Sequence, residues 1–182
     1  MADPRDYLAH DVLKDGTEVT VRAIRHDDDN TILDAFKNLD RDSVYRRFFS
    51  PKKDLTAAEL EQLTDVDFSQ VVALVVTTQG EDGETLIGGG RYARDGMGSV
   101  SAELAFTTDS NYRGGGIATS ILRHLVRIAR EAGVSRFEAD VLAENQPMLA
   151  VFRHSGLPMQ LRRDGGVVHV TLSLQPDSRQ QT

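Results

Sequence analysis

The sequence contains no cysteine among its 182 residues. This absence excludes a thiol nucleophile, disulfide bonds and every zinc, iron–sulfur or haem site that requires a thiolate ligand. Long apolar segments are also missing: the longest uninterrupted run, residues 71–76, has six residues, whereas a bilayer span needs about 20. The charged residues 1–6 precede no apolar stretch of the kind that a signal peptide contains. We therefore expect no membrane span and a cytoplasmic location.

Positive charge is scarce. Lysine and arginine number 21 against 28 aspartates and glutamates, which gives a net charge of −7. A general nucleic-acid binder needs the opposite sign, so nucleic acid is not an expected partner. An acidic surface instead tolerates cationic partners such as amines or lysine side chains.

The length predicts one domain, because a typical domain has about 150 residues. A chain of this size can bury about 70% of its unfolded surface and needs no disulfide or metal for stability. The composition, 40% hydrophobic and 27% charged residues, is typical of a soluble globular protein. We expect an N-terminal arm at residues 1–14, a domain at residues 15–174 and a flexible tail at residues 175–182.

Periodicity predicts seven strands and four or five helices. The strands are expected at residues 17–24, 71–76, 86–92, 99–107, 135–142, 159–162 and 167–174. Helices are expected after His26, in a short segment from Ser43, after the Thr56–Glu59 capping box, at residues 117–129 and from Gln146 to near Gly156. This order indicates an α+β fold around one mixed, mostly antiparallel sheet flanked by helices.

One loop is typical of anion binding. The run Arg113-Gly114-Gly115-Gly116 lies between a strand and an amphipathic helix, whose free N–H groups and dipole suit a phosphate. No Walker sequence is present, and the dinucleotide fingerprint fails because Thr119 occupies its third glycine position. The alternative reading is a flexible strand-to-helix connector.

The same loop resembles the acyl-CoA pyrophosphate motif of the GNAT superfamily of N-acetyltransferases, Arg/Gln-x-x-Gly-x-Gly/Ala, matched by Arg113, Gly116 and Ala118. The resemblance extends over residues 17–174 and includes residues 143–148 and 154–157, which are similar to the later Glu-Asn-x-x-Met … Gly-Phe segment of the superfamily. Residues 43–49 resemble the corresponding helix of bacterial Pat-type protein lysine acetyltransferases.

This resemblance implies that acetyl-CoA is the cosubstrate, that no metal takes part and that acyl-CoA lies where strands 99–107 and 135–142 splay apart. The implied CoA-binding residues are Phe106, Thr107, Thr108, Arg113, Gly114, Gly115, Gly116, Ile117, Ala118, Thr119, Asn145 and Phe152. Asn145 could equally cap the helix that follows it. Five scattered histidines show no metal-ligand spacing, so we expect surface or packing roles for them.

For catalysis, the resemblance implies Glu103 as general base and the backbone N–H of Phe106 as oxyanion donor. The alternative for Glu103 is an exposed strand residue in a surface ion pair. Many members carry a tyrosine as general acid where this chain has Phe152, so water, the acceptor's own proton, Tyr112 or Tyr45 would have to replace it. Tyr45 could also be a core aromatic residue.

The implied function is transfer of an acetyl group to a primary amine. A lysine of a protein is the expected acceptor, and an acyl-CoA synthetase is one protein that would present it. Two alternatives remain open: a small-molecule amine as acceptor, and a non-catalytic acyl-CoA sensor. The oligomeric state is open, and neither nucleic acid nor membrane is an expected partner.

Overall fold

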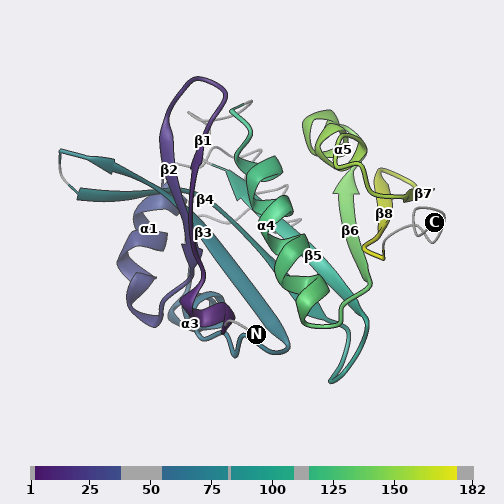
Figure 1. Ribbon diagram of the computed structural model, residues 1–182, viewed down its shortest axis with the longest axis horizontal. Coiled ribbons are helices and arrows are strands. Elements are labelled where there is room, and N and C mark those ends of the chain that lie inside the picture. Colours follow the sequence, from purple (N-terminus) through teal and green to yellow (C-terminus); the bar gives the residue numbers. More distant parts are fainter. Residues whose placement is uncertain (1–2, 38–54, 82, 109–114, 176–182) are drawn as a thin grey trace, which may run out of the picture.

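A computed structural model describes residues 3–37, 55–81, 83–108 and 115–175 (Figure 1). The strands form one eight-stranded sheet in the order β1-β2-β3-β4-β5-β6-β8-β7. They are β1 (Leu8–Val12), β2 (Glu18–Ala23), β3 (Val71–Gly80), β4 (Gly83–Arg94), β5 (Ser101–Thr108), β6 (Arg136–Leu142), β7 (Met159–Asp164) and β8 (Val167–Ser173). Every neighbouring pair is antiparallel except β5 and β6, which are parallel. The expected mixed, mostly antiparallel sheet is confirmed.

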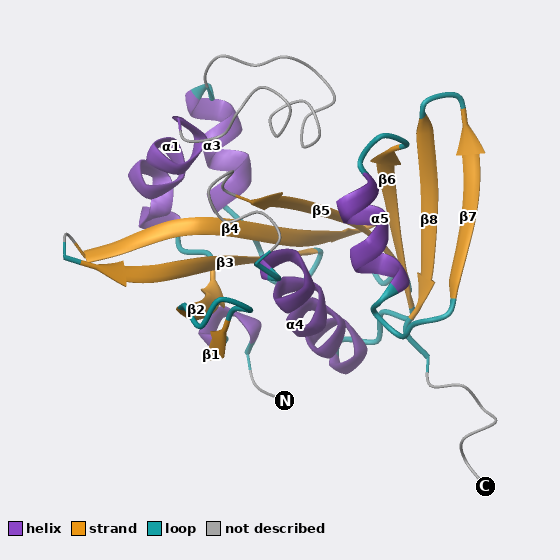
Figure 2. Cartoon of the chain, turned by 90° about the horizontal axis from the view of Figure 1, so that it is seen from above, coloured by secondary structure: helices purple, strands orange, loops and turns teal. Residues whose placement is uncertain are grey.

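Helices cover both faces of this sheet. The described helices are α1 (Asp29–Lys37), α3 (Ala57–Thr64), α4 (Ile117–Glu131) and α5 (Gln146–Arg153), with short 3₁₀ turns η1 (Pro4–Asp6) and η2 (His26–Asp28). Figure 2 shows α1 and α3 on one side of β3 and β4, and α4 on the other. In the described part of the chain, no helix has the length and apolarity that crossing a bilayer requires.

The expected loose arm at residues 1–14 is wrong for residues 8–12. These residues form β1, which pairs with β2 from Leu8↔Arg22 to Val12↔Glu18. Side-chain contacts with α4 then hold the strand: Tyr7 hydroxyl contacts Nδ1 of His124, whose Nε2 lies 2.8 Å from the Asp11 carboxylate. Ser120 also donates a hydrogen bond to Asp11. The N-terminal segment is therefore part of the domain.

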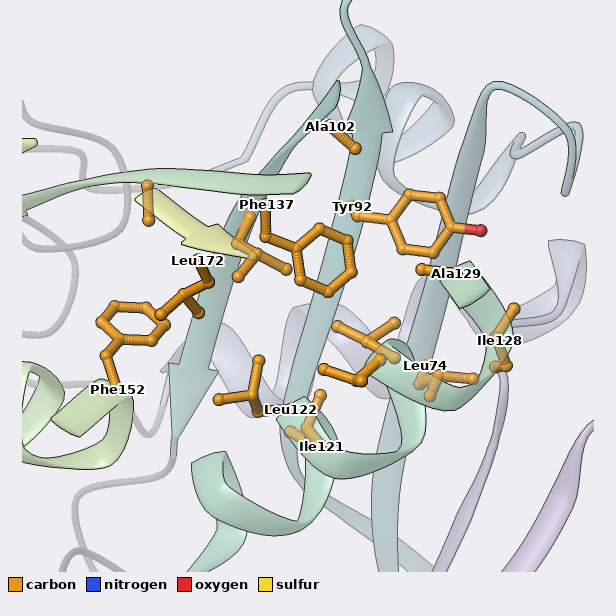
Figure 3. Packing of buried hydrophobic residues seen from close by; sticks show 14 of the residues in the cluster. Leu74, Tyr92, Ala102, Ile121, Leu122, Ile128, Ala129, Phe137, Phe152 and Leu172 are labelled. Atoms are coloured by element: carbon orange, nitrogen blue, oxygen red, sulfur yellow. The ribbon is translucent and has the colours of Figure 1, made fainter. Parts of the chain in front are cut away.

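The main core lies between the sheet and α4, whose apolar stripe is buried as its periodicity predicts. Figure 3 shows Ile121, Leu122 and Ile128 of α4 facing the sheet, where the Tyr92 and Phe137 rings lie 5.5 Å apart. Glycine makes this approach possible. A Cβ at Gly88 would lie 2.7 Å from the Ile117 side chain, and one at Gly90 would lie 2.6 Å from the Ile121 side chain. The glycines of β4 thus allow the helix to pack directly against its backbone.

On the opposite face, α1 and α3 form a smaller cluster around Phe36, Leu55 and Leu60. The predicted capping box of α3 is confirmed: Thr56 and Glu59 exchange side-chain to backbone hydrogen bonds at 3.1 and 3.2 Å. The short helix expected from Ser43, with Tyr45, Arg46 and Arg47, lies outside the described residues.

A buried ion cluster joins β2 to the start of α1 and to β4. Arg22, 3% exposed, donates two 2.9 Å hydrogen bonds to Asp28 and one of 2.7 Å to Glu84. Burial lowers the pKa of the Arg22 guanidinium, but these carboxylates raise it by more, so its pKa lies above the ordinary arginine value. Asp28 also accepts the Arg25 backbone N–H at 2.6 Å. The cluster fixes the end of the sheet beneath α1.

Candidate active site

Strands β5 and β6 pair only at their beginnings, over Ser101↔Arg136, Ala102↔Phe137 and Glu103↔Glu138. Beyond Glu103, β5 pairs with β4 alone and β6 with β8 alone. Figure 2 shows the two strands turning away from each other. The predicted splay is therefore present, and residues 104–108 of β5 have no strand partner on the β6 side.

Phe106, Thr107 and Thr108 all lie in this unpaired stretch of β5. The Phe106 ring faces the α4 side and lies 6.1 Å from the ring of Phe152. Phe152 is 1% exposed and belongs to the main core, so it shapes the splay by supporting Phe106. Direct contact of Phe152 with CoA, and donation by the Phe106 N–H to an oxyanion, stay predictions.

Glu103 is the last residue of the paired stretch and shares a sheet face with Ala105 and Thr107. It is exposed, and it forms no ion pair with any described residue. The surface ion pair considered for Glu103 therefore finds no support within the described structure. A carboxylate at the point where two strands part can meet an amine that approaches from this face.

Further acidic groups continue this face onto β6. Glu138, in register with Glu103, accepts a 3.1 Å hydrogen bond from the Ser101 hydroxyl. His169 on β8 lies 2.8 Å from Asp140 and 3.4 Å from Glu138. The hydrogen bond with Asp140, aided by Glu138, raises the pKa of His169 above its ordinary value despite partial burial. This face therefore favours a cation.

The glycine loop ends at the N-terminus of α4. Gly116 is the N-cap residue and adopts φ 93°, a left-handed conformation that favours glycine, and no side chain caps the helix. The N–H groups of Ile117, Ala118 and Thr119 have no partner inside the helix. They can hold phosphate oxygens. Gly115 is described, whereas Arg113 and Gly114 lie outside the described residues.

Lys14 is a residue at this loop that the sequence analysis missed. Its backbone N–H donates to the Gly115 carbonyl at 3.1 Å. Its side-chain carbons lie 3.7 and 3.8 Å from the position of a Cβ at Gly116. Asp15-Gly16, between two strand segments, is a hairpin signal that could have revealed this turn. The Lys14 side chain thus brings a positive charge from the β1–β2 turn to this loop.

Asn145 caps α5: its side chain accepts the Met148 backbone N–H at 3.4 Å. The capping role is confirmed, and a hydrogen bond to CoA stays a prediction. His124 and His169 take part in the contacts described above, as packing and surface residues. The described residues contain no group of three or more histidines and carboxylates placed to hold a metal ion.

A pocket opens on the other side of β4 and β5, between the sheet and helices α1 and α3. It has a volume of about 760 Å³ including its open mouth, and its described lining residues include Ile32, Phe36, Arg91, Ala105 and Thr107. Ala105 and Thr107 follow Glu103 on the same face of β5. The pocket is therefore adjacent to Glu103.

Comparisons with known proteins agree with this geometry. Residues 34–157 match the Acetyltransferase (GNAT) family. "Acetyltransferase Pat" of Mycolicibacterium smegmatis is 36% identical over 135 residues, which cover 74% of this chain and 39% of that protein. An acetyltransferase of Pseudomonas aeruginosa is 31% identical over 140 residues, 75% of this chain and 73% of that protein. The chain thus spans well under half of the first relative.

Among solved structures, the GNAT domain of S. lividans PAT superposes with a TM-score of 0.83 at 33% identity, covering 91% of this chain and 96% of that one. The parted strands β5 and β6 and the glycine N-cap of α4 lie where the resemblance described above places the acyl-CoA. The chain belongs to the GNAT acetyltransferase family.

Proposed function

We propose that the protein transfers the acetyl group of acetyl-CoA to a lysine side chain of another protein, with Glu103 as general base. The observation that carries this proposal is the place of Glu103: an exposed, unpaired carboxylate at the point where β5 and β6 part. Similarity to proteins named Pat supports a protein acceptor, as does the acidic face that continues from Glu103 to Glu138 and Asp140.

In the proposed reaction, Glu103 takes one proton from the lysine ammonium, directly or through a water. The nitrogen lone pair then forms a bond to the thioester carbonyl carbon while the Phe106 N–H donates to the carbonyl oxygen. The carbon–sulfur bond breaks, and the departing thiolate receives the second proton that the nitrogen loses. The products are an acetylated lysine, free CoA and the proton on Glu103, which passes to solvent.

The energetics of the proton steps are compatible with these residues. An ordinary lysine ammonium has a pKa of about 10.4, so loss of its proton near neutral pH is uphill, and the carbon–nitrogen bond forms from the small fraction of neutral amine that results. Neither described tyrosine supplies the hydroxyl that Phe152 lacks: Tyr92 is fully buried, which raises its pKa to about 12, and the Tyr7 hydroxyl contacts His124 of α4. Tyr45 and Tyr112 lie outside the described residues. A thiol with pKa about 8.5 can leave with the proton from nitrogen.

Replacing Glu103 tests this proposal. Glu103→Gln keeps the shape and removes the basicity, so kcat should fall about 10²–10⁴-fold while acetyl-CoA affinity is kept. Glu131→Gln, at the far end of α4, is the matched control and should be neutral. The assay measures acetylation of a purified acyl-CoA synthetase and, in parallel, of free lysine and spermidine.

The outcomes separate the alternatives. If Glu103→Gln turns over at the wild-type rate with an unchanged pH profile, the general base is another group. Acetyl-CoA binding without turnover of any amine would indicate a sensor. Higher kcat/KM for a free amine than for every protein tried would favour a small-molecule acceptor.

A further inference from the structure

Arg91 is a cation in an apolar pocket. Among the described lining residues of the pocket between the sheet and α1 and α3, it is the only charged one. Its strand neighbours Gly89 and Gly90 carry no side chain, and Ile32 and Phe36 of α1 form part of the opposite wall. The guanidinium therefore lies in an environment with little polar solvation.

Arg91 has no partner there: it forms no hydrogen bond or ion pair with a described residue. Burial lowers the pKa of Arg91, and no carboxylate opposes that effect. Arg22, by contrast, is a structural arginine whose charge is neutralised by the carboxylates of Asp28 and Glu84. A desolvated cation without a partner is a cost to folding. An anion that enters the pocket would remove that cost.

The position of Arg91 relative to Glu103 suggests the nature of that anion. Arg91 is opposite Ala105, and Glu103 is opposite Ala93, so both charged residues lie on one face as diagonal neighbours on adjacent strands. Diagonal neighbours lie about 7–8 Å apart. One acceptor molecule could thus place its amine at Glu103 and a carboxylate at Arg91, provided that only a few bonds separate the two groups.

We propose that Arg91 binds a carboxylate that the acceptor carries close to its reactive amine. This inference rests on the proposed function and narrows its acceptor. The carboxylate can come from an aspartate or glutamate beside the acceptor lysine of a protein, or from the α-carboxyl group of a free amino acid. A guanidinium suits either one because it can form two parallel hydrogen bonds to a carboxylate.

The test uses matched acceptors and two variants. Two peptides differ only in glutamate or glutamine beside one lysine, and free lysine is compared with lysine amide. Wild type should prefer the acidic member of at least one pair by about 10-fold or more in kcat/KM. Arg91→Met should abolish this preference through a higher acceptor KM, and Arg91→Lys should restore part of it. The KM for acetyl-CoA should not change.

Two controls make the result decisive. Arg163→Met, on the exposed strand β7, should keep the wild-type preference. The midpoint of thermal unfolding of Arg91→Met should stay level or rise, because an unpaired, half-buried cation is removed. A preference for the glutamate peptide over the glutamine peptide indicates a protein acceptor. A preference for lysine over lysine amide, without a preference between the peptides, indicates a free amino acid.

The inference is overturned if wild type prefers neither acidic acceptor or if Arg91→Met keeps the preference. Calorimetric binding of the two peptides decides the question without turnover. If the protein acetylates no amine but binds the glutamate peptide only when Arg91 is present, the proposed function fails and the binding assignment stands.

Discussion

The backbone N–H of Lys14 donates to the carbonyl of Gly115 at 3.1 Å, although 101 positions of sequence separate them. The bond joins the β1–β2 turn to the loop before α4. The Lys14 side chain lies against Gly116, so its ammonium can reach a phosphate at the helix N-terminus. Strand β1, held by the contacts of Tyr7 and Asp11 with His124, positions this lysine.

Lys14→Ala should weaken acetyl-CoA binding about 10-fold, because one charge-assisted contact contributes about 1.5 kcal/mol or more. Lys14→Arg should retain most of the affinity. Adding salt should also weaken acetyl-CoA binding less in Lys14→Ala than in wild type. Calorimetry at two salt concentrations measures both effects, with Lys37→Ala, at the end of α1, as control. Equal affinity and equal salt dependence in Lys14→Ala would remove Lys14 from the site.

Gly116→Ala should reduce both stability and acetyl-CoA affinity. A side chain at φ 93° costs about 1–2 kcal/mol, and relief of that strain would turn the helix N–H groups away from the phosphates. Gly133→Ala is a matched control at the other end of α4, since Gly133 has φ 86° and open space around it. Urea unfolding should show similar losses for both variants, and calorimetry should show weaker binding only for Gly116→Ala. Equal binding by the two variants would contradict the phosphate site.

Asp28→Asn should destabilise the protein by about 3–5 kcal/mol, because it leaves the buried Arg22 guanidinium undercompensated. Glu84→Gln should cost less, since the Glu84 side chain is 33% exposed. Urea unfolding measures both free energies. Similar small losses in the two variants would mean that either carboxylate alone is enough to compensate Arg22.

The stability of the C-terminal strands should depend on the charge of His169. Its pKa is raised above 6.5, chiefly by the hydrogen bond with Asp140. The stabilising contribution is therefore complete below pH 6.5 and is lost as pH rises through the higher folded-state pKa. The unfolding midpoint of His169→Gln, measured from pH 5.5 to pH 8.5, should change less with pH than that of wild type. Parallel profiles would show that His169 has the same pKa folded and unfolded.

Strong local patterns predicted most of the fold. The stripe of α4, the β-branched run of β3 and the capping box of α3 each determine an element from neighbouring residues alone. Strand β1 was missed because, apart from its pairing with the neighbouring strand β2, its contacts are with the distant helix α4. Both of its ends are exposed, Leu8 at 61% and Val12 at 66%. It contributes no buried apolar pattern of its own.

The site was predictable only in part, for a similar reason. The motif beginning at Arg113 and the alternation around Glu103 are local, so the sequence indicated them. Lys14 reaches the site through a hydrogen bond between segments far apart in the chain, and Arg91 enters a pocket whose other wall comes from the distant helix α1. Arg91, in a glycine-rich strand, has no sequence feature that separates it from a solvated arginine.

The parting of β5 and β6 also places two open strand edges in the middle of a sheet. Natural sheets usually protect open edges, because an unpaired backbone can recruit another extended chain and begin aggregation. Here the short ladder ending at Glu103↔Glu138 leaves residues 104–108 open on one side. If the extended arm of acetyl-CoA pairs with that edge, as the resemblance implies, the cosubstrate should also protect the protein from aggregation. The unpaired backbone groups of residues 104–108 should therefore make the protein more prone to self-association when acetyl-CoA is not bound.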